Sequence, residues 1–289
     1  MTDSTGAIRY AAHDDYIVDA ADGCILRPPD SRMPLLSPDE LCTDGPRVLE
    51  SRVVTVDYLH ESQPRFNEAS LDRSHLLPGT SGRLRAGQPV TICVVGDSIS
   101  AGYDATGFRG VPPFQPPYVD LVAHALEAAG RSPIVMHNHA VAGWTTEHAQ
   151  WEMSEVARRE PSLVFIALGM NDATYAEPHQ FAERIAAMVL QLSSEAAETE
   201  LLLLTPMLPT SACTWVNTDW IEGYRAALLA LERTGIAVAD VTRMWRRLLE
   251  RKHPLELSGN GTNHPNDFGH RVYAQTVLAA LGRLAPFLE

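Results

Sequence analysis

The stretch that decides the fold of this chain reads Val90-Thr91-Ile92-Cys93-Val94-Val95-Gly96-Asp97-Ser98-Ile99-Ser100. It begins as a run of β-branched and apolar residues, which is typical of a buried strand, and then breaks into Gly-Asp-Ser, which is typical of a tight turn. Ligands of open parallel α/β sheets bind in the crevice outside the carboxyl ends of the strands. The stretch therefore predicts that the hydroxyl of Ser98 lies where such folds carry out chemistry.

Strand and helix patterns alternate from Gln88 onward. Further apolar runs predict strands, and the segments between them carry apolar residues at helical spacing. The later predicted strands are residues 134–141, 163–168, 201–204 and 236–239. Strands joined by helices form right-handed crossovers, so the pattern predicts an α/β fold with a doubly wound, five-stranded parallel sheet.

Residues 1–88 have a different pattern, rich in Pro, Asp and Arg and without a convincing helix. Two segments are typical of extended chain, and the first leads to a typical hairpin turn: Tyr16–Asp19, Arg47–Tyr58 and the turn Asp22-Gly23. Pro78–Gly82 predicts a loop or linker. We therefore expect a small β-rich region over residues 1–88, packed on or beside an α/β domain over residues 89–289.

Composition and charge argue against several classes of partner. The chain has 289 residues, of which 45% are hydrophobic and 20% charged, as in a globular protein with a substantial core. Its formal net charge of −13 makes nucleic acid and anionic membranes unsuitable main partners. No apolar run approaches the roughly 20 residues of a membrane span, and the first residues lack a signal-peptide pattern. We expect a cytoplasmic protein with a small-molecule partner; the oligomeric state stays open.

The cysteines and histidines do not indicate a metal site or a redox pair. The cysteines show no Cys-x-x-Cys spacing: Cys24, Cys42, Cys93 and Cys213. A Cys24–Cys42 disulfide stays open. His137 and His139 alternate onto one face of a predicted strand, but no carboxylate or cysteine completes a ligand set at a suitable spacing. We therefore expect neither a metal nor a cofactor.

Polar or glycine-containing blocks follow three of the predicted strands, and a fourth block precedes the last predicted helix. They are Gly96–Ser100, Asn138–Thr146, Gly169–Asp172 and Asn263–His270. One such block alone is an ordinary turn or helix cap. All of them in this order, at strand ends, indicate one shared site.

These blocks, within residues 90–289, resemble those of the SGNH (GDSL-type) hydrolase family, which is named for a Ser, a Gly, an Asn and a His. The resemblance implies a flavodoxin-like three-layer α/β/α sandwich and the hydrolysis of acyl esters without a cofactor. Matched to the family's blocks, Ser98 would be the nucleophile and His264 the general base. The oxyanion hole would be formed by the backbone N–H groups of Ser98 and Gly143 and by the side-chain amide of Asn171.

The residue types fit this chemistry. A serine hydroxyl is a poor nucleophile until a base takes its proton, and a neutral imidazole does so near pH 7. The tetrahedral intermediate needs donors aimed at its oxyanion, and a glycine lets the backbone come close. His270 lies one turn into a helix with an apolar inner side, so we expect it to be structural.

The block that contains His264 departs from the family pattern in one respect. The family usually has an Asp three residues before this His, and here that position is Gly261. A loop carbonyl from Gly259, Asn260 or Gly261 would then fix the imidazole in a Ser-His dyad. Asp267 is the nearest carboxylate in the sequence and is the alternative, although capping the last helix is its simpler role.

The substrate is predicted less sharply than the reaction. A β-rich N-terminal region with no Asp before the His is similar to carbohydrate acetyl esterases, which implies a short acyl group, chiefly acetyl, on a sugar or polyol. Asp97, Tyr103 and Trp144 are candidates for the substrate wall. The alternatives are a lipid or thioester hydrolase, a catalytically silent ligand-binding member, and a metal-dependent hydrolase.

Overall fold

The computed structural model describes residues 1–3, 5–21, 24–35, 52, 54–56, 71–130 and 132–282. Its main sheet has five parallel strands in the order β6-β5-β7-β8-β9. Their bounds are β5 (Val90–Gly96), β6 (Ile134–Asn138), β7 (Leu163–Ala167), β8 (Glu200–Leu204) and β9 (Ile236–Ala239). The predicted α/β fold with five parallel strands is confirmed. Because the chain changes direction at the first strand, the crevice expected in such a sheet lies at the ends of β5 and β7.

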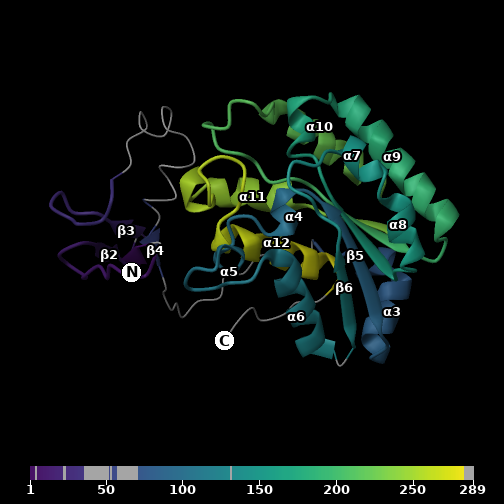
Figure 1. Cartoon of the computed structure of the whole chain (residues 1–289), viewed down its shortest axis with the longest axis horizontal. Helices are drawn as coiled ribbons and strands as arrows, with labels where there is room; N and C mark the ends of the chain where they lie inside the picture. Colours follow the sequence, from purple (N-terminus) through teal and green to yellow (C-terminus); the bar gives the residue numbers. More distant parts are fainter. Residues whose placement is uncertain are drawn as a thin grey trace.

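Helices cover the sheet on both faces (Figure 1). On one side α6 (Tyr118–Gly130) packs against α12 (Asp267–Ala280). On the other, α9 (Pro178–Glu195) packs between α8 (Met153–Arg158) and α10 (Thr218–Leu229). The central strands are buried on both faces, which explains why they read as continuous apolar runs.

The helix predicted over residues 145–159 is divided into α7 (Thr146–Gln150) and α8. At the break, the N–H groups of Trp151 and Glu152 donate to carbonyls three residues back instead of four. This tighter bonding ends α7 and lets the chain turn before α8 begins. Residues 139–145, in front of α7, belong to the site described below.

The linker predicted at Pro78–Gly82 is instead the start of a helix, α3 (Pro78–Ala86). The buried Glu200 carboxylate, at the start of β8, accepts the N–H groups of Gly79 at 2.8 Å and Thr80 at 2.7 Å. It thereby satisfies the first turn of α3, and Pro78 suits the first helical position because it needs no N–H partner there. A capping group 120 residues away is invisible to local sequence patterns.

The segment from Leu71 to α3 packs with the α/β core. Leu71, Leu77 and Leu84 are buried among the residues of that core. The division of the chain at residue 88 stays a prediction, and these contacts favour a boundary earlier in the chain.

The N-terminal region contains two small antiparallel sheets, as the sequence predicted. β1 (Thr2–Asp3) pairs with β4 (Val54–Thr55), and β2 (Ile17–Asp19) pairs with β3 (Cys24–Leu26). In Figure 1 this region lies at the side of the main sheet, at the purple end of the colour scale. The predicted turn at Asp22-Gly23, Cys42 and most of the strand predicted at residues 47–58 lie outside the described residues.

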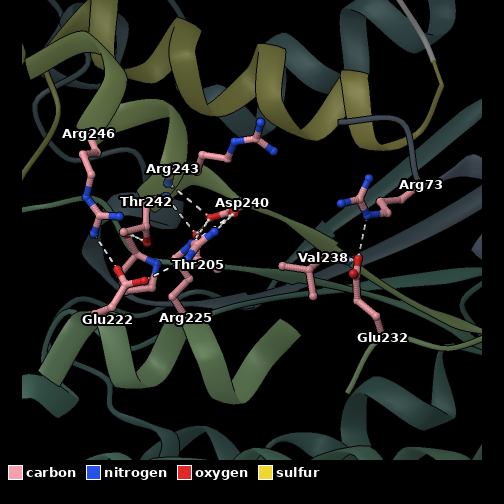
Figure 2. Close-up of polar contacts among 11 residues, drawn as sticks. Arg73, Thr205, Glu222, Arg225, Glu232, Val238, Asp240, Thr242, Arg243 and Arg246 are labelled. Carbon is pink, nitrogen blue, oxygen red and sulfur yellow. Dashed lines mark hydrogen bonds and ion pairs between the residues drawn. The ribbon is translucent and has the colours of Figure 1, made fainter. Parts of the chain in front are cut away.

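A polar network occupies the carboxyl ends of β8 and β9 (Figure 2). The carboxylate of Asp240, directly after β9, accepts two-pronged hydrogen bonds from Arg225 of α10, at 2.8 and 2.7 Å. Thr205, directly after β8, accepts the N–H of Thr242 at the start of α11 (Val241–Leu249). These strand ends therefore hold α10 and α11 in place.

Candidate active site

Ser98 is the first residue of α4 (Ser98–Ala101), a single helical turn that follows β5. The Asp97 carboxylate accepts the N–H of Ile99 at 2.9 Å and so caps this turn. Gly96 is required here: a Cβ atom on it would lie 2.6 Å from the Cβ of Ser100. The turn thus holds the Ser98 side chain at the carboxyl edge of the sheet, as the sequence predicted.

Three side chains form a hydrogen-bonded line that starts at Ser98. The Oγ atom of Ser98 lies 2.8 Å from Nε2 of His264. On the other side of the ring, Nδ1 of His264 lies 2.7 Å from Oδ2 of Asp104. The side chains of Asp104 and His264 are 10% and 16% exposed, so water competes little for this pairing.

The loop that carries His264 is organised by Asn260. Its Oδ1 atom accepts the backbone N–H groups of Thr262, Asn263 and His264, at 3.0, 3.1 and 3.0 Å. The hydroxyl of Ser258 donates to the His264 carbonyl at 3.1 Å. Because these contacts determine the backbone on both sides of the ring, the imidazole has little freedom to leave Ser98.

Asp104, rather than a loop carbonyl or Asp267, occupies the position beside Nδ1 of His264. The Asp267 carboxylate accepts the N–H and the hydroxyl of Thr106, at 2.8 and 2.7 Å. It thus fastens the start of α12 to Thr106, the first residue after the loop that follows α4. The structure therefore does not favour either arrangement that we considered from the sequence.

Sequence reasoning missed Asp104 because no spacing rule connects it to His264, 160 residues later. Two signals were available. Gly261 stands where the family usually has its acid, so a carboxylate from another loop was needed; and Asp104 lies in the loop directly after α4, on the same sheet edge as Ser98. Gly259 adds a signal that only the structure reveals: a Cβ atom there would lie 2.5 Å from the Cβ of Asp104.

Gly143 and Asn171 flank the end of β5 from the two neighbouring strands. The loop with Gly143 is tied to β5 by the N–H of Val141, which donates to the Gly96 carbonyl at 3.1 Å. The Asn171 side chain, after β7, donates to the Trp144 carbonyl at 2.9 Å. Gly143 is exposed and has a left-handed backbone with a φ of 83°, which glycine adopts without strain.

Asp172 holds this pair of loops together. Its buried carboxylate accepts the N–H of Thr146 at 2.9 Å and the hydroxyl of the same residue at 2.5 Å. Burial raises the pKa of Asp172. The residue it bonds begins α7, so Asp172 joins the loop after β7 to the loop after β6.

The candidates for a substrate wall differ in their surroundings. Asp97 is only 2% exposed and cannot line a substrate surface, because its carboxylate points into the turn that it caps. Trp144 is half-buried against the core. Tyr103 is 38% exposed, and its ring lies edge-on to His264 with 5.6 Å between centroids. Of these, Tyr103 has the surroundings that a wall residue needs.

His270 is fully buried and has both ring nitrogens engaged. Nδ1 accepts the N–H of Tyr118 at 3.3 Å, and Nε2 donates to the Tyr103 carbonyl at 3.0 Å. Burial lowers the pKa of His270 to about 4. A neutral ring that bonds two backbone groups is structural, as we expected, and it fixes the backbone next to Asp104.

Asp97 should make the stability of the protein pH-dependent. Burial raises its pKa to about 7 from an ordinary value of 3.8. The folded chain therefore keeps a proton that the unfolded chain releases, and this contribution to stability is complete below about pH 4 and is lost as the pH rises through 7. Asp97→Asn keeps the oxygen that caps Ile99 but cannot ionise. In urea unfolding, we expect this variant to lose less stability than the wild type between about pH 5 and pH 8; equal losses would contradict the assignment.

No group of three or more His, Cys, Asp and Glu side chains in the described part of the chain is arranged as a metal site. His139, considered above as one half of a metal pair, has Nδ1 2.9 Å from the Glu152 carboxylate. Among the helices that the structure describes, none is long and apolar enough to cross a membrane.

The comparisons with known proteins agree with this geometry. The profile of the GDSL-like lipase/acylhydrolase family matches residues 94–272, more than half of the chain. The chain belongs to this family. It is accordingly a carboxylic ester hydrolase, and Ser98, Gly143, Asn171 and His264 all lie within the matched residues. No curated protein matches the chain.

Several solved structures share the fold of this GDSL-like hydrolase. An alpha/beta hydrolase enzyme from the metagenome of Lake Arreo, Spain, is 22% identical, with a TM-score of 0.54 over 68% of this chain and 96% of that one. An acetylxylan esterase from Geobacillus stearothermophilus is 20% identical, with a TM-score of 0.55 over 68% and 96%. A two-domain esterase active on acetylated mannans is 18% identical, with a TM-score of 0.55 over 72% and 53%.

Proposed function

We propose that this GDSL-like hydrolase is a serine esterase that removes short acyl groups, chiefly acetyl, from a carbohydrate. The observation that carries the reaction type is the line of hydrogen bonds from Ser98 through His264 to Asp104, at 2.8 and 2.7 Å. A hydroxyl, an imidazole and a carboxylate in this order are the parts of a nucleophile, a base and the group that orients the base.

The mechanism begins with the proton of Ser98. Asp104 accepts the Nδ1 proton of His264 in a hydrogen bond, which leaves the lone pair of Nε2 directed at the Ser98 hydroxyl. As Oγ attacks the ester carbonyl, Nε2 takes the proton, and Asp104 stabilises the imidazolium that forms. His264 then gives the proton to the leaving alcohol. Water attacks the acyl-enzyme in a second, equivalent step and releases the acid.

The oxyanion of each tetrahedral intermediate needs hydrogen-bond donors that are already in place. The N–H groups of Ser98 and Gly143 and the side-chain amide of Asn171 are proposed for this role. Asn171 donates one N–H of its side chain to the Trp144 carbonyl. This hydrogen bond orients the amide and leaves its second N–H for the oxyanion. Donors held in this way cost no reorganisation when charge develops.

A carbohydrate ester is supported by two kinds of observation. Two structures with the same fold come from esterases whose described substrates are acetylated xylan and acetylated mannans. In this chain, an exposed aromatic ring, Tyr103, lies beside His264, where the alcohol half of the ester must leave. Rings of this kind commonly line sites for small ligands.

The test is a pair of substrate series. Hydrolysis of p-nitrophenyl esters from acetate to decanoate should be fastest for acetate and fall with chain length. Acetate should also be released from acetylated xylo- or manno-oligosaccharides. A preference for decanoate would favour the lipid hydrolase considered above. Absence of turnover on every ester would contradict the proposal and favour a silent, ligand-binding protein.

A further inference from the structure

Two exposed aromatic residues lie together next to the Ser98–His264–Asp104 hydrogen bonds: Tyr103, the candidate wall residue, and Phe108, which was not singled out from the sequence. Tyr103 lies two residues after α4, and Phe108 belongs to α5 (Thr106–Arg109). Their rings pack at 4.9 Å between centroids, tilted by 31°. The two residues are 38% and 51% exposed. Large rings that pack on each other and stay open to water form an apolar surface, and such surfaces at a site commonly receive a ligand.

The pair is held in place by the elements that hold the catalytic residues. The N–H of Tyr103 donates to the Ser98 carbonyl at 3.0 Å, and its own carbonyl accepts the His270 ring at 3.0 Å. Gly102, between α4 and Tyr103, is closely packed, since a Cβ atom on it would lie 2.5 Å from Cγ of Pro117 and 3.2 Å from Cδ2 of Phe108. The aromatic surface is therefore already formed before a substrate binds.

The position of the pair identifies which half of the substrate it meets. The leaving alcohol must take its proton from Nε2 of His264, so its oxygen lies within hydrogen-bond distance of that nitrogen. The Tyr103 ring lies 5.6 Å from the imidazole, centroid to centroid, and the Phe108 ring packs on Tyr103 and enlarges this surface. A group attached to the alcohol oxygen is thus within reach of the pair, whereas the acyl group lies toward the oxyanion donors.

We propose that Tyr103 and Phe108 form a platform on which the sugar ring bearing the ester packs, which rests on the carbohydrate esterase function proposed above. A pyranose ring has C–H groups on its faces and hydroxyls at its edge. It can therefore cover an aromatic pair while its hydroxyls stay in water. A flexible alkyl alcohol would need an enclosing groove to bury a comparable area, and two tilted, open rings do not enclose it.

The proposal predicts a change in substrate preference. The substrates are an acetylated xylo-oligosaccharide and ethyl acetate, whose alcohol half is too small to cover both rings. Phenyl esters are avoided because their leaving group is itself an aromatic ring. For Phe108→Ala we expect the ratio of kcat/KM for the saccharide to kcat/KM for ethyl acetate to fall about tenfold, mainly through the KM for the saccharide.

Two further variants separate binding from folding. Phe108→Trp keeps an aromatic face and should keep the wild-type ratio within about twofold. Trp151→Ala removes an aromatic residue that is 88% exposed in the turn between α7 and α8. This variant should leave kcat/KM unchanged for both substrates. If Phe108→Ala left the ratio of the two kcat/KM values unchanged, whether or not both values fell, the platform would be overturned. A wild type that hydrolyses ethyl acetate but no acetylated saccharide would instead overturn the carbohydrate function, and the platform with it.

Discussion

Ser98→Ala should lower kcat for ester hydrolysis by about 10⁴-fold or more, as removal of the nucleophile does in serine proteases. The reason is the short contact between Ser98 Oγ and His264 Nε2, which no neighbouring hydroxyl can replace. His264→Ala should cost about as much, and the double variant little more, because the two side chains act as one unit. The measurement is the steady-state rate of acetate release at saturating substrate.

Ser100→Ala is the matched control for Ser98→Ala. Ser100 belongs to the same short helix, but its hydroxyl is buried and hydrogen-bonded to the hydroxyl of Tyr118 at 2.7 Å. Its loss should cost roughly 1–3 kcal/mol of stability and leave kcat within about tenfold. If Ser98→Ala kept wild-type activity, or if the two alanine variants were equally impaired, the proposed nucleophile would be wrong.

Asp104→Asn should lower kcat by about 10⁴-fold, the loss known for the same change in a serine protease triad. The asparagine would fill the same space, but its amide carries no charge to stabilise the imidazolium. Its N–H₂ group can also donate to Nδ1, which would put the ring proton on Nε2 and prevent that nitrogen from accepting the Ser98 proton. The comparison is of kcat under identical conditions, with circular dichroism to verify folding.

Asp267→Asn distinguishes Asp104 from the other carboxylate of this region. It weakens the contacts of Asp267 with Thr106, so the melting temperature should fall while kcat stays within about tenfold. Full activity of Asp104→Asn together with a 10⁴-fold loss in Asp267→Asn would reverse the two assignments.

A carboxylate returned to the usual family position should partly rescue Asp104→Asn. Gly261, three residues before His264, has a left-handed backbone with a φ of 73°, which Asp tolerates better than most residues. In the double variant Asp104→Asn/Gly261→Asp, the new carboxylate would be in the loop that carries His264. We expect part of the lost kcat to return, whereas Gly261→Ala in the same background should return none.

The sheet and the Ser98–His264 pair illustrate what local patterns predict well. The apolar runs at β5, β7 and β8 are buried on both faces, and this burial is what made them continuous in the sequence. Parallel strands end at the same edge, so polar blocks that follow them had to gather there. The contact between Ser98 and His264 spans 166 residues and joins that edge to the loop in front of α12.

The predictions that differ from the structure concern groups whose partners lie far away in the sequence. The linker predicted at Pro78–Gly82 became part of α3 because Glu200 caps its first turn. Asp97, a candidate for the substrate wall, is buried because its carboxylate caps the helical turn that follows it. In each case a carboxylate accepts backbone N–H groups at the start of a helix, and the sequence pattern around that helix does not show it.

The amino-acid sequence by itself determined the α/β fold and the sheet edge at which the polar blocks gather, because hydrophobic periodicity and strand direction are properties of local segments. Only the tertiary structure decided which carboxylate supports His264. Asp104 and Asp267 are both close in sequence to a residue of the pair, and hydrogen bonding depends on where loops place oxygen atoms to within a few tenths of an ångström. That placement results from the packing of the loop after α4 against Gly259 and the start of α12, and no single segment encodes it.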